Sequence, residues 1–213
     1  MTVDELKRIY QAKRSLIKRK LSEFRTVGRE ASDDRLFEEL TFCIFTAGAS
    51  ARMGLNAVEG IRGVLADSSM TEIQQALQHR HRFPNARGAH VYSTREYLRA
   101  HCGLKMRELL DGFDTPDERR DFFALSPGVR GLWYKEASHF LRNVGYRGYA
   151  ILDKHILARL AEFGVIDSSK PASTRAQYVG MEASMKSFAD SVEIDFDELD
   201  LLLWYTKTGE ILK

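Results

Sequence analysis

The sequence predicts an all-α protein, because apolar residues recur with a period of about 3.6 along nearly the whole chain. No clean run of alternating apolar and polar residues, which would indicate a half-buried strand, interrupts the pattern. Only four prolines are present, and short breaks containing glycine or asparagine separate the periodic segments. At 213 residues the chain can bury a substantial core without disulfides or metal ions.

Periodicity and breaks together predict a series of helices. Acidic residues open the second of them, Ser69 or Thr71 caps the fourth, and Pro116 lies in the first turn of the seventh. The predicted helices span residues 3–27, 33–46, 50–65, 71–78, 84–102, 104–110, 116–124, 134–143, 154–163, 173–190 and 195–206. There is no internal repeat, low-complexity segment or long linker. We therefore expect a single unit over 1–213, with the N- and C-terminal helices packed together.

Charge and cysteine content exclude several classes of protein. Cys43 and Cys102 are far apart, without the four-cysteine spacing of a zinc or iron-sulfur site, so we expect a reducing cytoplasm. No run of 18 apolar residues suggests a transmembrane span, and the charged N-terminus does not resemble a secretory signal. The net charge is +2, but lysine and arginine cluster in residues 7–25 and 78–99. These clusters are either a polyanion-binding side or ordinary solvated helix faces.

The stretch "LSPGVRGLWYKEASHFLRN" predicts two helices joined by a short turn. The first helix ends at Leu125 or Ser126, and a second glycine, Gly131, precedes the next helix. Such a turn can aim backbone N–H groups and the positive end of a helix dipole at a DNA phosphate. Gly128, Arg130 and Gly131 are the candidate DNA contacts. An ordinary helix-to-helix turn is the alternative.

Lys135 falls in the first turn of the second helix. The helix dipole opposes a positive charge there and favours the neutral amine, the form that attacks carbon and builds a Schiff base. The alternative is a surface lysine compensated by the neighbouring Glu136. His139, one helical turn beyond Lys135, is better explained by packing or a phosphate contact than by catalysis.

Asp153 precedes "KHILARLAEFG", whose apolar residues follow a helical period. An N-cap aspartate is the simplest interpretation. Hydrogen bonds from backbone N–H groups also keep a carboxylate ionised, so the same residue could stabilise positive charge developing on a sugar. His155, two residues later, is left outside the catalytic set.

These segments together resemble the helix-hairpin-helix DNA glycosylases with lyase activity, and specifically the archaeal-type 8-oxoguanine DNA glycosylase/AP lyases. The resemblance is carried by "LFEELTFCIFTAGASA", "RFPNARGAHV", "KEASHFLRNVG", "ILDKHIL" and "ELDLLLWYTKTGEILK". It implies a hairpin at about 120–145 and two helical subdomains flanking a cleft for DNA and the damaged base. Lys135 would be the nucleophile and Asp153 its essential partner.

The resemblance also implies how the damaged base is read and what the protein binds. Trp204 would stack on the extruded base, and the α-carboxylate of Lys213 would enter its pocket. Phe83 would lie near the flipped base or the vacated position, unless it is a core phenylalanine, and Arg82 would contact DNA. The implied partner is double-stranded DNA carrying 8-oxoguanine or an abasic site. The implied enzyme is a cytoplasmic, nucleoid-associated monomer that uses no metal or organic cofactor.

One residue departs from the family pattern. The family hairpin has a glycine at the position of Trp133, two residues before Lys135. A side chain at this position could limit the approach of the backbone to phosphate.

Two other functions remain open at this point. One is a non-catalytic helix-hairpin-helix DNA-binding module, which would have no use for Lys135 and Asp153 together. The other is a Schiff-base lysine enzyme acting on a small metabolite, which should ignore DNA.

Overall fold

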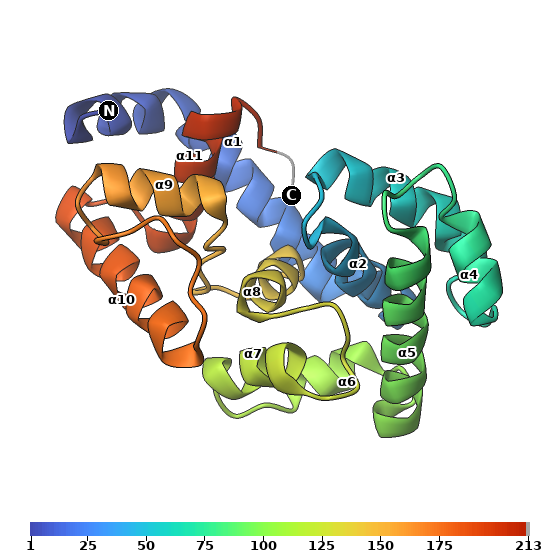
Figure 1. The fold of residues 1–213 in the computed structure, drawn as a ribbon. Helices are drawn as coiled ribbons and strands as arrows, with labels where there is room; N and C mark the ends of the chain where they lie inside the picture. Colours follow the sequence, from blue (N-terminus) through green and yellow to red (C-terminus); the bar gives the residue numbers. More distant parts are fainter. Residues whose placement is uncertain (212–213) are drawn as a thin grey trace. The chain divides into compact units, whose positions relative to one another are not determined.

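The computed structural model describes residues 1–211, and every regular element in that range is helical (Figure 1). The predicted all-α class is therefore confirmed. The elements are α1 (Val3–Glu30), α2 (Asp33–Thr46), α3 (Ala51–Ile61), the 3-10 helix η1 (Arg62–Val64), α4 (Met70–Ala76), α5 (Pro84–Cys102), α6 (Met106–Asp111), α7 (Pro116–Leu125), α8 (Tyr134–Asn143), α9 (Lys154–Glu162), α10 (Arg175–Val192) and α11 (Phe196–Thr208).

Several helix boundaries follow from local capping. The predicted bounds of α2, α5 and α8 agree with the structure. The fourth helix is capped by Ser69 rather than Thr71, through a capping box in which the Ser69 and Glu72 side chains each bond the other's backbone N–H. The tenth begins later than predicted because the Thr174 side chain caps it.

The segment predicted as one helix over 50–65 is the main difference. Its regular part ends at Ile61, and the chain then tightens into η1. Such 3-10 turns are common at helix ends and leave the apolar spacing almost unchanged. Periodicity therefore could not separate the two elements.

The chain divides into two compact units. Unit 1 comprises Met1–Thr26 and Leu141–Lys213, and unit 2 comprises Val27–Phe140. Both boundaries fall inside helices, the first in α1 and the second in α8.

Unit 2 is built around α2, which is buried at nearly every position after Arg35. Helices α3, α5 and α6 pack against α2, and α4 packs against α5. The apolar run Phe42–Phe45 is completely enclosed, which explains why this segment lacks a polar face.

Unit 1 is built around α11, whose apolar residues Leu199 and Leu201–Leu203 are buried. Helices α9 and α10 pack against α11. The first part of α1 also contacts α11, because the Tyr10 hydroxyl donates a 2.6 Å hydrogen bond to Glu198. Lys18 lies 3.8 Å from the same carboxylate.

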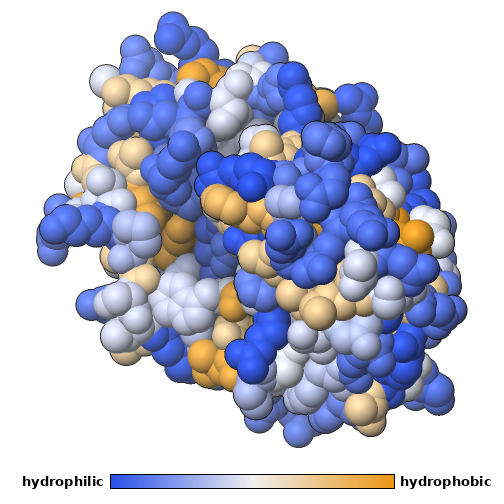
Figure 2. Space-filling model, turned by 45° about the vertical axis from the view of Figure 1, so that its right-hand side comes forward, coloured by the Kyte–Doolittle hydropathy of each residue, from blue (hydrophilic) through white to orange (hydrophobic). Residues whose placement is uncertain are grey.

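The surface in Figure 2 is predominantly hydrophilic, with hydrophobic residues in small, separate groups. No helix within residues 1–211 has the length and apolar character needed to cross a membrane.

Candidate active site

The hairpin between α7 and α8 lies against α5. Thr94 on α5 accepts a 2.9 Å hydrogen bond from the backbone N–H of Arg130 through its hydroxyl. Gly128 faces the Tyr97 ring so closely that a Cβ at Gly128 would lie 2.1 Å from ring carbons. The hairpin therefore requires glycine at this position, and one face of α5 fixes its backbone.

Gly131 is also required in the hairpin, because of its backbone conformation. Its φ of +80° lies in the left-handed region, which disfavours side chains. A Cβ at Gly131 would also lie 2.6 Å from Nδ1 of His90 on α5. The three predicted hairpin residues Gly128, Arg130 and Gly131 are thus brought together, with Arg130 exposed.

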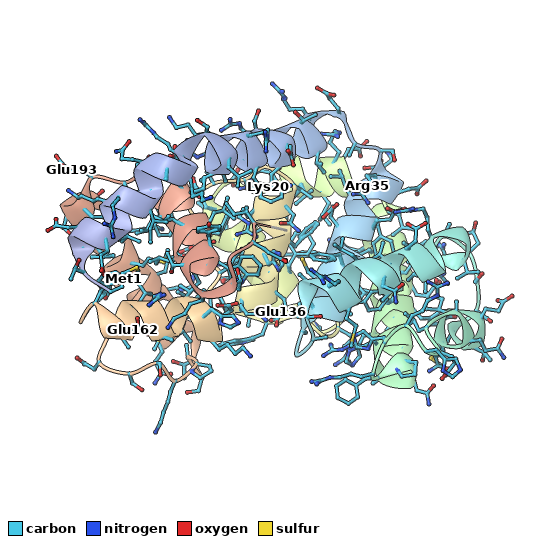
Figure 3. The ribbon with its side chains drawn as sticks, turned by 90° about the horizontal axis from the view of Figure 1, so that it is seen from above. Met1, Lys20, Arg35, Glu136, Glu162 and Glu193 are labelled. Carbon is cyan, nitrogen blue, oxygen red and sulfur yellow. The ribbon has the colours of Figure 1, made fainter. Side chains whose placement is uncertain are left out.

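Lys135 lies in the first turn of α8, as predicted, and is about a quarter exposed. Its Nζ is 2.9 Å from Oε1 of Glu136. Glu136 is labelled in Figure 3. The other Glu136 oxygen accepts a 3.2 Å hydrogen bond from the backbone N–H of Trp133. Glu136 therefore caps the helix and also provides the counter-charge of Lys135.

Trp133, the departure from the family pattern, fits without backbone strain. Among residues 1–211, the non-glycine residues with positive φ are His79, Leu104 and Glu193. The Trp133 indole packs edge-on against Tyr134, with ring centroids 5.3 Å apart. The side chain is thus accommodated beside the start of α8.

Phe83 and Arg82 lie together just before α5. Phe83 is 47% exposed, so the alternative of a core phenylalanine is wrong. The Arg82 guanidinium lies over the Phe83 ring, 4.6 Å from its centroid, and donates a hydrogen bond to the Gly48 carbonyl. The pair presents an aromatic ring and a positive charge at the surface of unit 2.

Sequence reasoning missed His81, which holds this loop in place. The buried ring bonds the Phe45 carbonyl through Nε2 at 2.9 Å and accepts the Phe83 N–H through Nδ1 at 3.0 Å. A carbonyl can only accept, so this arrangement assigns the proton to Nε2 and leaves the ring neutral. Burial lowers the pKa of His81, and the charges of Arg87 and Arg82 lower it further, against the opposing Phe45 hydrogen bond.

Acid should therefore weaken this loop. The folded-state pKa of His81 lies below its unfolded value, so the unfolded chain binds the proton more readily and stability falls as pH drops below about 6.5. We expect the loss of unfolding free energy between pH 7 and pH 5 to be smaller in His81→Gln than in the unmodified protein. Guanidinium unfolding at both pH values measures it. Equal losses in the two proteins would contradict the neutral assignment.

Of the predicted catalytic pair, Lys135 belongs to unit 2 and Asp153 to unit 1. Asp153 is the N-cap of α9, as predicted, and its Oδ1 accepts hydrogen bonds from His155 at 2.8 Å and Ile156 at 2.9 Å. No described residue donates a hydrogen bond to Oδ2. The carboxylate thus has one oxygen that caps the helix and a second oxygen available for another task.

The segment leading to Asp153 is held by buried acids, a feature that sequence reasoning also missed. Three backbone N–H groups each bond a buried carboxylate, and each carboxylate also pairs with a cation. Gly148 bonds Asp197 (2.9 Å), which pairs with Arg147; Ala150 bonds Glu182 (2.8 Å), which pairs with Lys186; and Ile151 bonds Asp200 (3.0 Å), which pairs with Arg142. This non-helical segment therefore obtains from side chains the backbone hydrogen bonds that regular structure would supply.

Asp200 is the most deeply buried of these acids. Burial raises the pKa of Asp200 to about 6, and the charges of Asp153 and Asp197 act in the same direction. Arg142 and the Ile151 N–H oppose the shift.

Two further predicted residues concern base recognition. Trp204 is partly buried near the end of α11, and its carbonyl accepts a hydrogen bond from Thr208. Lys213 lies outside the described residues.

Comparison with known proteins identifies the family. The sequence model described as 8-oxoguanine DNA glycosylase matches residues 17–194. The chain belongs to this family. The predicted resemblance is therefore confirmed.

Relatives within the family match nearly the whole chain. The 8-oxoguanine DNA glycosylase/AP lyase of Korarchaeum cryptofilum is 36% identical, over 94% of this chain and 91% of the relative. The enzyme of the same name from Methanocaldococcus jannaschii is 32% identical, over 98% of this chain and 99% of the relative.

Solved structures of the 8-oxoguanine DNA glycosylase family share the fold. The 8-oxoguanine DNA glycosylase of Thermotoga maritima superposes with a TM-score of 0.87 at 31% identity, covering 99% of this chain and 98% of that one. The M. jannaschii 8-oxoguanine glycosylase/lyase in complex with a 15mer DNA containing 8-oxoguanine gives a TM-score of 0.87 at 30% identity, covering 98% and 99%. The predicted helix-hairpin-helix glycosylase fold is confirmed.

Proposed function

We propose that this protein excises 8-oxoguanine from double-stranded DNA and then cleaves the strand, with Lys135 as nucleophile and Asp153 as its charged partner. The observation that carries the proposal is the nearly full-length match to relatives named 8-oxoguanine DNA glycosylase/AP lyase. The local geometry supports it. Lys135 is partly exposed in the first turn of α8, and Asp153 caps α9 with one oxygen while its second oxygen is available.

In this proposal the damaged nucleotide leaves the duplex before chemistry, since C1′ is inaccessible within the stack. The extruded base stacks on Trp204, and Phe83 with Arg82 contacts DNA near the vacated position. The hairpin residues Gly128, Arg130 and Gly131 hold the phosphate backbone. All of residues 1–213 then act as one glycosylase unit, working at the nucleoid because its substrate is chromosomal DNA.

The chemistry then proceeds by covalent catalysis. Lys135 first loses its ammonium proton, and the neutral nitrogen then forms a bond to C1′ as the bond between C1′ and the base breaks. The base departs with the bonding electron pair and takes up a proton. The ionised Asp153 stabilises the positive charge that develops on the sugar. Ring opening gives a Schiff base, loss of a C2′ proton allows β-elimination, and the C3′–O bond breaks on the 3′ side of the lesion.

Trapping with borohydride tests this function directly. Incubation with an 8-oxoguanine duplex under borohydride should give a stable protein–DNA adduct, whereas the same duplex with guanine should give almost none. Lesion binding in a gel shift without an adduct would favour the non-catalytic DNA-binding module. Absence of both would favour a Schiff-base enzyme acting on a small metabolite.

The hairpin gives a separate prediction. Gly131→Ala should lower the free energy of unfolding by about 1–2 kcal/mol, because it places a side chain in the left-handed region. It should also weaken DNA binding, because the clash of the added Cβ with His90 displaces the hairpin backbone. Gly103→Ala is the matched control: Gly103 has a φ of +61° but no neighbour within 4 Å of an added Cβ. The control should lose comparable stability in chemical unfolding yet bind DNA normally. Equal DNA affinities for the two variants would remove Gly131 from the phosphate contact.

A further inference from the structure

One buried carboxylate, that of Asp200, joins two functional elements. Asp200 is 1% exposed, and its Oδ1 accepts a 3.0 Å hydrogen bond from the backbone N–H of Ile151. Its Oδ2 accepts a 2.9 Å hydrogen bond from Nη1 of Arg142, which is 6% exposed. Both oxygens are therefore engaged, each by a different segment of the chain.

Each of these segments leads to a proposed catalytic residue. The Ile151 carbonyl accepts a 2.7 Å hydrogen bond from the backbone N–H of Asp153. The N–H of Ile151 is therefore held by the Asp200 side chain and its carbonyl by the Asp153 backbone. Arg142 lies seven positions after Lys135 on the same helix, α8, about two turns away. Asp200 thus connects the backbone that presents Asp153 to the last turn of α8, and both lie in unit 1.

Stability is a weak reason to keep a charged pair at this place. Taking two charges out of water costs several kcal/mol per ion, and well-packed apolar residues often replace such pairs without loss. Asp197 and Glu182 bond the same segment, but their cations Arg147 and Lys186 are about half exposed and reach solvent. Only in the Asp200–Arg142 pair, among these three, are both partners buried.

We propose that Asp200 is a positioning residue, whose carboxylate fixes the Ile151–Asp153 backbone against Arg142 in the last turn of α8 and so aims the Asp153 carboxylate. This inference rests on the proposed role of Asp153. Asp200 itself touches no substrate; it acts through the backbone and through Arg142.

A double-mutant cycle separates this role from a purely structural one. Asp200→Asn keeps an oxygen for the Ile151 N–H but offers Arg142 an uncharged group. We expect its single-turnover excision rate, at equal folded fraction, to fall by about tenfold or more, with DNA affinity within about threefold. In the Asp153→Asn background, Asp200→Asn should cause no further loss, because the group that it positions is already disabled.

Two additional variants keep the test decisive. Asp197→Asn is the matched control, since Asp197 is a buried acid one turn earlier on α11 and bonds Gly148, five residues before Asp153. It should destabilise the fold while leaving the excision rate within about twofold. If Asp200→Asn does not fold, Arg142→Lys runs the same cycle, because it retains the charge but shifts the contact with Oδ2.

The outcomes are distinct. Equal losses from Asp200→Asn, or from Arg142→Lys in its place, with and without Asp153→Asn would overturn the positioning role. An unchanged rate in the single variant would do the same. If Asp153→Asn alone retains full activity, the proposed role of Asp153 fails first, and that result is visible before the cycle is complete.

Discussion

Lys135→Gln should abolish base excision and strand cleavage while retaining binding to a lesion-containing duplex. Glutamine preserves much of the length and polarity of lysine, but its amide nitrogen cannot attack C1′ or form a Schiff base. We expect the single-turnover rate to fall on the order of 10³-fold or more. The borohydride adduct should disappear in the same experiment, while a gel shift reports the retained affinity.

A second lysine provides the control for this change. Lys154 is an exposed lysine in the first turn of α9, as Lys135 is in the first turn of α8. Lys154→Gln should therefore form the adduct normally. Persistent trapping in Lys135→Gln would assign the nucleophile to another amine. If both variants lose the adduct, peptide mapping of the adduct formed by the unmodified protein identifies the lysine that attacks.

Asp153→Asn should leave the fold intact and reduce excision by about 100-fold or more. Asparagine is as good an N-cap as aspartate, so its oxygen can still accept the His155 and Ile156 hydrogen bonds. What disappears is the negative charge that stabilises the developing cation, an effect of roughly 2.7 kcal/mol or above. Thermal unfolding and single-turnover kinetics on the same preparation separate the two contributions.

The matched control is another capping aspartate of unit 1. Asp195 caps α11 by the same pattern, with Oδ1 accepting from Asp197 and Glu198. Asp195 also pairs with Arg147 at 2.6 Å, so Asp195→Asn should lower stability at least as much as Asp153→Asn and yet leave the excision rate unaltered. If Asp153→Asn is as active as Asp195→Asn, then Asp153 is a cap and nothing more.

Much of the helical framework could be predicted from local signals. Pro84 at the first turn of α5 and Gly103 in the left-handed conformation at its end mark the two boundaries of this helix. Short side chains such as Ser32 mark the start of α2 in the same way. These signals act within one turn of the chain, and for this reason a single sequence reveals them.

The supports of the site could not be predicted in this way. The acids of "DSVEIDFDELD" look like a solvated face, yet Asp197 and Asp200 are buried. Their backbone partners, Gly148 and Ile151, each lie 49 residues earlier in the sequence, so no local signal reveals the contacts. His81 gives no local signal either, because its Phe45 partner lies 36 residues earlier. Burial of polar side chains is decided by tertiary contacts, whereas the catalytic candidates carry a family pattern that is local.

Because unit 1 combines both ends of the chain, the two units should fold in a fixed order during synthesis. Unit 2 is one uninterrupted stretch, Val27–Phe140, whereas residues 1–26 of unit 1 cannot meet their partners until α11 has left the ribosome. During that interval Leu6, Tyr10 and Ile17, all buried in the finished fold, have nothing to cover them. We expect the nascent chain to protect unit 2 from pulsed hydrogen exchange first, with residues 3–26 of α1 exposed as a candidate chaperone-binding segment until α11 has emerged. Early protection of residues 3–26 on stalled, truncated chains would show instead that this segment finds temporary cover.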